Sequence, residues 1–147
     1  MELIELTDQQ AEALDDALSA YDDAHMPRPM AGSVRIGLAE NGRVVAGLDG
    51  CVTSFRTLYV STVFVAEEWR RRGLGRRLMA EMERRAEAMG VTVIRLDTFD
   101  WQGVAFYRAL GYEEAGHYDA PEDGFSEHFF VKRLKRPENG RVADGNL

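Results

Sequence analysis

The alternation of apolar and polar residues along the chain predicts one α/β domain with a mixed sheet. Apolar residues at helical spacing predict a surface amphipathic helix from Thr7 to about Tyr21, and a second helix from Leu74 to Met89. A shorter pattern of the same kind predicts a third helix from Gln102 to Leu110. Alternating or continuous apolar runs predict strands at residues 34–40, 43–48, 57–65, 91–97, 114–118 and 125–134.

Turn residues and strand composition indicate how these elements connect. Asn41-Gly42 is a two-residue turn signal, so the strands on either side form a hairpin, and a further turn is expected at Asp49-Gly50 or in the residues that follow. The run from Thr57 to Val65 is the most strand-like in the chain and is expected to be central. A helix and then a strand follow it, so it is expected to pair in parallel with residues 91–97. The domain is expected to end at residue 134, before a disordered polar tail at 135–147.

Composition and charge exclude several classes of protein. The 147 residues are 45% apolar and 29% charged, with no apolar run long enough for a membrane span, so a cytoplasmic protein is expected. The single cysteine, Cys51, excludes an intramolecular disulfide and is expected to be a small buried residue. The three histidines show no metal-ligand spacing, so no metal site is expected. A net charge of −7 disfavours a nucleic-acid partner, and binding through the arginines at 70–77 is only a weak alternative.

Five arginines and two glycines lie between the predicted central strand and the second helix, in the segment Arg70-Arg71-Arg72-Gly73-Leu74-Gly75-Arg76-Arg77. Backbone NH groups at a helix N-terminus attract anions, and glycines let a phosphate approach them closely. Cations there oppose the helix dipole by ~0.3–1 kcal/mol each, so they are unfavourable unless an anion binds. The segment therefore predicts a pyrophosphate site. It lacks the Gly-Lys-Ser/Thr of a Walker loop and the three-glycine dinucleotide pattern, which disfavours a nucleoside triphosphatase or an NAD enzyme.

These residues resemble the phosphate loop of the GNAT superfamily of acetyl-CoA-dependent N-acetyltransferases. The family pattern Arg/Gln-x-x-Gly-x-Gly/Ala is matched by Arg70, Gly73 and Gly75, and a later Tyr-x-x-x-Gly-Phe/Tyr pattern is matched by Tyr107, Gly111 and Tyr112. The resemblance covers about residues 34–134. Within the family, the sequence is similar to a bacterial subgroup whose acceptors are mostly unassigned. It implies a single domain at residues 1–134, with a mostly antiparallel sheet of six or seven strands, a splayed parallel central pair and about four helices.

The resemblance also implies the site. The pantetheine arm of acetyl-CoA would pair with backbone groups at Phe64 and Val65, and the amides of residues 71–76 would hold its pyrophosphate. Tyr107 would give a proton to the departing thiolate; its alternative role is that of a core aromatic. The residues implied to bind the cofactor are Phe64, Val65, Arg70, Arg71, Arg72, Gly73, Leu74, Gly75, Arg76, Gln102 and Phe106.

The general base and the acceptor are left open. Ser61 and Thr62 stand where relatives often carry an acidic residue, so the candidates for the base are Glu67, Glu68, Asp97, His117 or His128, and water. The implied function is transfer of an acetyl group from acetyl-CoA to a primary amine of a small molecule or a protein. The alternative is a catalytically idle GNAT-fold module that binds CoA or a protein partner. A homodimer is also left open.

Overall fold

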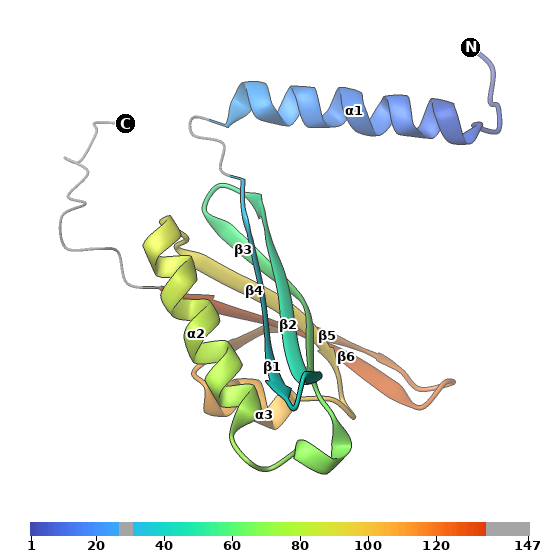
Figure 1. The fold of residues 1–147 in the computed structure, drawn as a ribbon. Coiled ribbons are helices and arrows are strands. Elements are labelled where there is room, and N and C mark those ends of the chain that lie inside the picture. Colours follow the sequence, from blue (N-terminus) through green and yellow to red (C-terminus); the bar gives the residue numbers. More distant parts are fainter. Residues whose placement is uncertain (27–30, 135–147) are drawn as a thin grey trace.

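The computed structural model describes residues 1–26 and 31–134, so the predicted disordered tail at 135–147 lies outside the described residues. Six strands form one sheet in the order β1-β2-β3-β4-β6-β5 (Figure 1). The elements are α1 (Asp8–His25), β1 (Ser33–Glu40), β2 (Arg43–Ser54), β3 (Thr57–Val65), the one-turn helix η1 (Glu67–Trp69), α2 (Leu74–Met89), β4 (Val93–Phe99), α3 (Val104–Ala109), β5 (Glu113–Ala120) and β6 (Phe125–Arg133).

The sheet confirms the expected mixed topology. β3 and β4 are the central strands and pair in parallel, while every other neighbouring pair is antiparallel. The helix between β3 and β4 lies on one face of the sheet, as a parallel pair requires. The described residues contain three α-helices and the single turn η1, close to the four helices expected.

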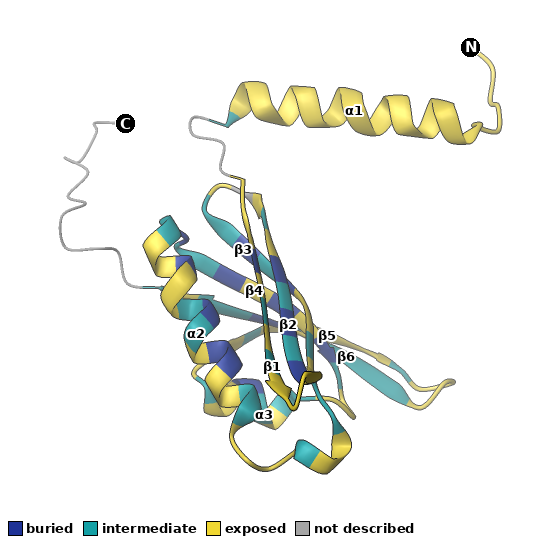
Figure 2. Cartoon of the chain, viewed as in Figure 1, coloured by how far each residue is buried: buried dark blue, intermediate teal, exposed yellow. Residues whose placement is uncertain are grey.

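One face of the sheet is covered by α2, and the core lies between them (Figure 2). The apolar residues whose spacing predicted α2 form its buried side, since Leu78, Met79, Met82 and Ala86 are all buried. They pack in one cluster with sheet residues such as Phe130, and each large buried side chain stabilises the fold by roughly 1.5–3 kcal/mol. The helix ends at Gly90, whose φ of 89° favours glycine.

Of the two places expected for the second turn, Asp49-Gly50 is wrong and the residues that follow it are right. β2 stays extended through these residues because it is hydrogen bonded to β1 on one side and β3 on the other, and the chain turns at Phe55 and Arg56, where φ is 23° and 59°. In place of a turn, Asp49-Gly50 faces a bulge. Asp49 pairs with Thr62 and Gly50 pairs with Val60, so Ser61 has no partner on β2.

In the part of the chain that the structure describes, no helix packs on the other face of the sheet, and we call it the open face. Directly paired residues share a face, so the register places Arg35, Cys51, Tyr59, Arg95, Asp97 and Phe129 there. Cys51 is exposed. The expectation of a buried cysteine is therefore wrong, because its strand is covered on one face only.

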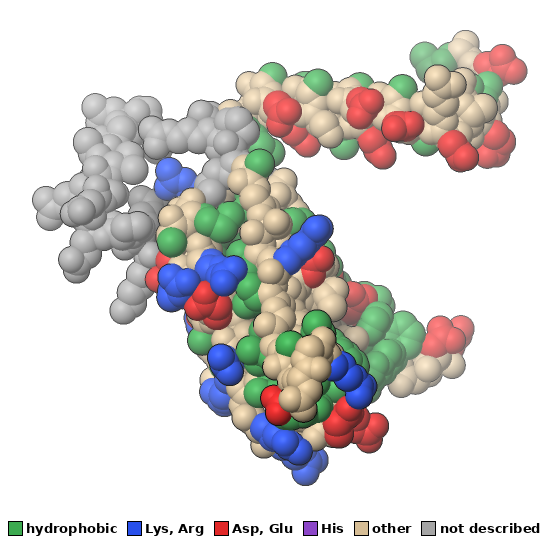
Figure 3. Space-filling model, in the orientation of Figure 1, with side chains coloured by type: hydrophobic (Ala, Val, Ile, Leu, Met, Phe, Trp, Pro, Cys, Tyr) green, Lys and Arg blue, Asp and Glu red, His purple; other side chains and the backbone are tan. Residues whose placement is uncertain are grey.

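Helix α1 extends away from the sheet and buries none of its residues (Figure 2). Its start is as predicted: the Thr7 side chain accepts a hydrogen bond from the Gln10 amide, and the Gln10 side chain accepts one from the Thr7 amide. Its end lies at His25, one turn beyond the predicted Tyr21. The charged side chains visible on α1 are acidic, whereas the sheet domain shows Lys and Arg side chains together with acidic ones (Figure 3). None of the helices in the described residues has the length and apolar composition that a bilayer span requires.

Candidate active site

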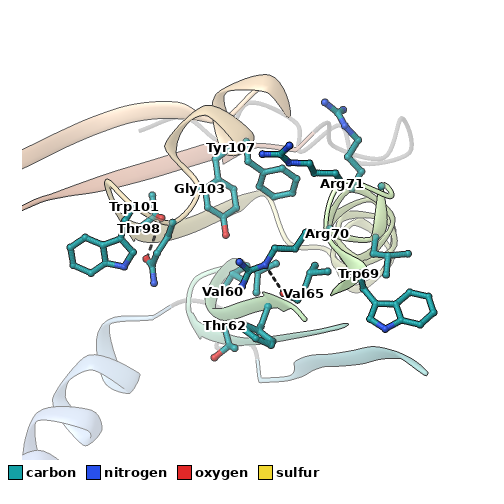
Figure 4. A pocket seen from close by; sticks show the side chains of 18 of the residues that line it. Val60, Thr62, Val65, Trp69, Arg70, Arg71, Thr98, Trp101, Gly103 and Tyr107 are labelled. Atoms are coloured by element: carbon teal, nitrogen blue, oxygen red, sulfur yellow. Dashed lines mark hydrogen bonds between the residues drawn. The ribbon is translucent and has the colours of Figure 1, made fainter. Parts of the chain in front are cut away.

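The central parallel pair separates into a cleft. β3 and β4 are paired only from Thr57 with Val93 to Val60 with Leu96, although β3 continues to Val65 and β4 to Phe99. The bulge at Ser61 bends β3 where this pairing stops. A cleft of about 1000 Å³ lies beyond this point, between the ends of the two strands, α3 and the N-terminus of α2 (Figure 4). Strand edges inside it leave backbone NH and C=O groups without a partner strand, so an extended ligand can pair with them.

The N-terminus of α2 forms one end of the cleft. Gly73 precedes the helix with a φ of 77°, and no side chain caps the amides that follow it. The first turn of α2 carries no acidic residue. Arg71 also has a positive φ, 60°, and such alternation of backbone conformation turns successive NH groups toward one point. The amides of Leu74, Gly75 and Arg76 thus lack a capping side chain, and this end of the cleft is suited to an anion.

The arginines of the loop have different surroundings. The Arg70 side chain donates to the carbonyl of Val65 at 3.0 Å, which holds the loop against the end of β3 (Figure 4). Arg72 instead donates to the carbonyl of Glu68 at 3.0 Å and lies 4.8 Å from the centre of the Trp69 ring. Arg70, Arg71 and Arg76 line the cleft, but Arg72 does not. The geometry gives Arg72 a role in shaping the loop.

Glycines allow α2 and α3 to approach each other and the cleft. A Cβ atom on Gly75 would lie 3.1 Å from the Phe106 ring, and one on Gly103 would lie 3.0 Å from the Tyr107 ring. Side chains at these two positions would make contacts tighter than ordinary ones and would require each ring to shift by a few tenths of an ångström. Gly75 therefore serves the packing of Phe106 as well as access to the helix amides.

Tyr107 lies at the wall of the cleft with its hydroxyl pointing into it (Figure 4). The residue is only 8% exposed, and its ring packs against Phe106, Tyr112 and Phe130. Among the described residues, its hydroxyl has no hydrogen-bond partner and is not a buried unsatisfied group, so it remains open to the cleft. Burial raises the pKa of Tyr107 to about 12, which keeps the phenol protonated at neutral pH. Tyr107 is thus both a core residue and a proton donor facing the cleft.

The far end of the cleft is formed by the loop after β4. The side-chain oxygen of Gln102 accepts from the Phe99 amide at 2.8 Å and from the Thr98 hydroxyl at 3.3 Å. Its amide NH₂ group is therefore the part left for a ligand. Trp101 follows the same strand, is 66% exposed and stacks on Phe99 with ring centres 4.7 Å apart.

Several cleft residues were missed by sequence reasoning: Trp69, Thr98, Trp101 and Gly103. Trp101 had a usable signal, because a large aromatic in a short polar loop is unusual unless something covers it. Thr98 had none, since its role depends on the fold of the loop. The residues that the resemblance implied to bind the cofactor all line the cleft except Arg72, and Tyr107 lines it as well.

Of the candidate bases, the structure brings one to the cleft. Asp97 lines it and is exposed, and the Tyr59 hydroxyl donates to its carboxylate at 3.1 Å. Glu67 and Glu68 lie on η1 outside the cleft lining, where Glu68 forms an exposed ion pair with Arg43 at 3.6 Å. Burial and the neighbouring Asp97 carboxylate together raise the pKa of Tyr59, so this phenol keeps its proton and its hydrogen bond.

The histidines lie elsewhere, in a cluster that their sequence spacing did not predict. β5 pairs with β6 so that His117 lies directly opposite His128, and Glu114 joins them with ligand atoms within 4.8 Å of one another. His128 is hydrogen bonded through Nδ1 to Glu114 and through Nε2 to Ser126. Bonds from His128 and Arg108 hold the pKa of Glu114 below its usual range. The cluster is a hydrogen-bonded network outside the cleft lining, so neither histidine is placed to act as the base.

Comparison with known proteins identifies the family. Residues 2–112 match the Acetyltransferase (GNAT) family. Blasticidin-S acetyltransferase of Streptomyces morookaense is 33% identical over 108 residues, which are 73% of this chain and 79% of that protein.

Solved structures agree. An acetyltransferase from Bacillus cereus ATCC 14579 is 28% identical, with a TM-score of 0.85 over 91% of this chain and 98% of that one. The ribosomal-protein-S18-alanine N-acetyltransferase of Escherichia coli has a TM-score of 0.63 over 82% of this chain and 79% of its own, and at 20% identity it shows the fold alone. None of these matches favours an idle module. The chain belongs to the GNAT acetyltransferase family and is an acetyl-CoA-dependent N-acetyltransferase.

Proposed function

We propose that this enzyme acetylates a primary amine of a small molecule, with Tyr107 as the general acid and Asp97 as the general base. One observation supports this most strongly. A single cleft joins an uncapped helix N-terminus, a protonated phenol and a carboxylate. These are the groups needed to hold a phosphorylated thioester, to protonate its sulfur and to remove a proton from an amine.

The residues of the cleft fit acetyl-CoA, which supplies the acetyl thioester. The amides of residues 73–76 would hold its pyrophosphate, with Arg71 and Arg76 close enough to meet further phosphate charge. Backbone groups of Phe64 and Val65 face the gap left by β4 and would pair with the amides of the pantetheine arm. Gln102 would add its NH₂ group at the other end, and Phe106 would provide apolar contact.

Tyr107 is suited to act on the departing thiolate. Its phenol is protonated at neutral pH and has no competing acceptor among the described residues, so it is free to donate to negative charge that develops in the cleft. The same low-polarity wall that raises the pKa of the phenol also raises that of a thiolate beside it, which favours proton transfer. A buried, uncharged phenol is thus suited to protonate the departing thiolate.

Asp97 is suited to act on the incoming amine. An alkyl ammonium titrates near 10, so its proton has to be removed before the nitrogen attacks at neutral pH. The carboxylate is exposed at the open edge of the cleft, where an acceptor would enter, and the bond from Tyr59 fixes its orientation. Its negative charge also attracts a cationic acceptor.

The rim of the cleft favours a small, flat acceptor. Trp101, Phe99 and Phe125 form one aromatic group, with Trp101 and Phe125 ring centres 5.9 Å apart. The exposed indole is placed to stack on a ring or to attract a cation. The Streptomyces relative is a Blasticidin-S acetyltransferase, which supports a small-molecule acceptor here as well.

A panel of amines tests this proposal. Acetyl-CoA consumption would be measured with blasticidin S, with small aromatic and aliphatic amines, and with peptides that carry a lysine or a free N-terminus. We expect turnover of aromatic or cationic small amines at least tenfold above that of the peptides. Faster acetylation of the peptides would show a protein acceptor instead. From the sequence we further propose that the enzyme is cytoplasmic and acts without nucleic acid, membrane or metal.

A further inference from the structure

Helix α1 presents an apolar stripe that no other described residue of its chain covers. Leu14, Leu18 and Tyr21 lie on one side of the helix at helical spacing and are 57%, 58% and 63% exposed. Not one residue of α1 is buried. The stripe is the kind of surface that a globular domain normally packs against a sheet.

The helix also lacks the means to be stable alone. Most helical stability in proteins comes from tertiary packing of an amphipathic face, and α1 has no such packing within the described residues. Asp8, Glu12 and Asp16 follow one another at four-residue intervals, and like charges at this spacing destabilise a helix by roughly 0.2–0.5 kcal/mol per pair. Asp22 and Asp23 stand near the C-terminal end, where negative charge opposes the helix dipole. A partner surface is therefore needed to keep α1 helical.

A solved relative shows the same arrangement. The Bacillus cereus structure aligns with 91% of this chain, whereas residues 33–134 make up little more than two thirds of it. The aligned part thus includes α1. A TM-score of 0.85, on a scale with a maximum of 1, exceeds what the sheet domain alone would give at perfect superposition. The extended position of α1 is accordingly shared with a crystal structure.

The open face of the sheet is a matching surface. No described segment of the chain covers it, and it carries Phe129 at 38% exposure, Tyr118 at 45% exposure and the exposed Cys51. Gly37 and Gly47 lie directly opposite each other on β1 and β2, so no side chain stands on the sheet there and a helix can approach closely.

The charges favour this face over a second α1. The open face carries charges of both signs, whereas α1 carries acidic residues and no Lys or Arg. The charged residues of the open face are Arg35, Arg95 and Arg133 together with Asp49, Asp97, Glu113 and Glu127. Two α1 helices side by side would place like charges together.

We propose that α1 of one copy docks on the open face of a second copy, and that the reciprocal contact forms a helix-exchanged homodimer. The apolar stripe would pack on Phe129 and the surrounding strands, while most of the acidic residues of α1 would stay on its solvent side. Thr62 and Asp97 belong to both the open face and the cleft lining. If the proposed function holds, α1 of the second copy borders the side on which the amine enters.

Oligomeric state tests the proposal directly. The molar mass of the full chain would be measured by light scattering after size exclusion, with acetyl-CoA present and absent. The wild type is expected at twice 16.5 kDa. Leu14→Glu combined with Leu18→Glu should give 16.5 kDa, because two charges replace the centre of the stripe. Gln9→Glu with Ser19→Glu adds the same charge to the opposite side of α1 and should remain dimeric.

Variants of the open face distinguish the helix-exchanged homodimer from other dimers. Phe129→Glu and, independently, Cys51→Glu place a carboxylate on the open face and should also give monomers. Stabilisation by acetyl-CoA should survive in every variant, which shows that the sheet domain is folded whatever the acceptor proves to be. A monomeric wild type at about 100 µM, where a dimer with a low-micromolar Kd would be nearly fully formed, would overturn the proposal. So would a dimer that only the α1 variant disrupts, since that result means pairing between the two α1 helices.

Discussion

Replacing Tyr107 with phenylalanine removes one oxygen atom from the cleft and leaves the ring in place. The ring is held by Phe106, Tyr112 and Phe130 at centre distances of 5.1, 6.0 and 6.1 Å, and these contacts do not involve the hydroxyl. No described residue hydrogen bonds to the hydroxyl. The substitution should therefore leave the free energy of unfolding at pH 7 within about 0.5 kcal/mol of wild type, as for changes that break no buried interaction.

The catalytic effect should be much larger. General acid catalysis contributes typically 10²- to 10⁴-fold, so Tyr107→Phe should lower kcat by that order if thiolate departure limits the rate. The assay follows CoA release by chromatography, because the exposed Cys51 would react with a thiol-detecting reagent. Acetyl-CoA should still raise the melting temperature, equivalent to ~2.7 kcal/mol at a hundredfold excess over Kd.

Alkaline pH gives an independent measure of the same hydroxyl. The pKa of Tyr107 is about 12 in the folded protein and near 10 when unfolded, so the unfolded chain loses this proton first as the pH rises. The associated stability is fully present below pH 10 and is lost as the pH rises toward 12. The shift of about two pKa units corresponds to a loss of stability of roughly 2.7 kcal/mol in total, of which about 1.4 kcal/mol is lost by pH 11.

Urea denaturation at pH 7 and pH 11 tests this sign. Tyr107→Phe should match wild type at pH 7 and exceed it at pH 11, because phenylalanine has no proton to lose. A kcat within about threefold of wild type, with cofactor stabilisation intact, would refute the catalytic role. Equal stabilities of the two proteins at pH 11 would instead refute the raised pKa. Loss of stabilisation by acetyl-CoA would mean that the substitution weakens cofactor binding, so that the lower activity could not be assigned to proton transfer.

Three further substitutions have distinct expected results. Asp97→Asn should lower kcat at least tenfold at pH 7 and recover part of it at pH 9–10, where the free amine becomes abundant; a flat ratio across this pH range would exclude Asp97 as the base. Gly75→Val should abolish stabilisation by acetyl-CoA in a thermal shift assay, because even its Cβ would lie 3.1 Å from the Phe106 ring at the anion-binding end; normal binding would contradict the role of this loop. Glu83→Gln should lower the free energy of unfolding by about 1–3 kcal/mol in urea, since Glu83 accepts from Tyr112 and from Lys132, both at 3.0 Å. Glu87→Gln on the same helix is the matched control, because Glu87 is exposed, and an equal loss there would show that helix charge alone is responsible.

Local patterns in the sequence were sufficient for most of the fold and for one end of the site. The spacing of Leu78, Met82 and Ala86 determined α2 and its buried side, because a helix repeats every 3.6 residues. The hairpin at Asn41-Gly42 and the extended run of β3 depend on equally local preferences. The glycines and arginines at 70–76 indicated an anion site because the amides of one helix start are close together in the chain.

Tertiary structure decided what depends on residues far apart in the sequence. Asp97 differs from Glu67 and Glu68 only by its position relative to the splayed strands, which follows from the bulge at Ser61. His117 and His128 meet because β5 and β6 pair in one particular register, and no spacing rule contains that register.

The exposure of Cys51 and of the α1 stripe was decided in the same way. A strand buried on one face has the same local pattern whether or not a helix covers its other face. An amphipathic helix likewise has the same sequence whether its partner surface is its own sheet or that of a second copy. Patterns fix which side of an element is apolar, but only the assembled fold determines what that side contacts.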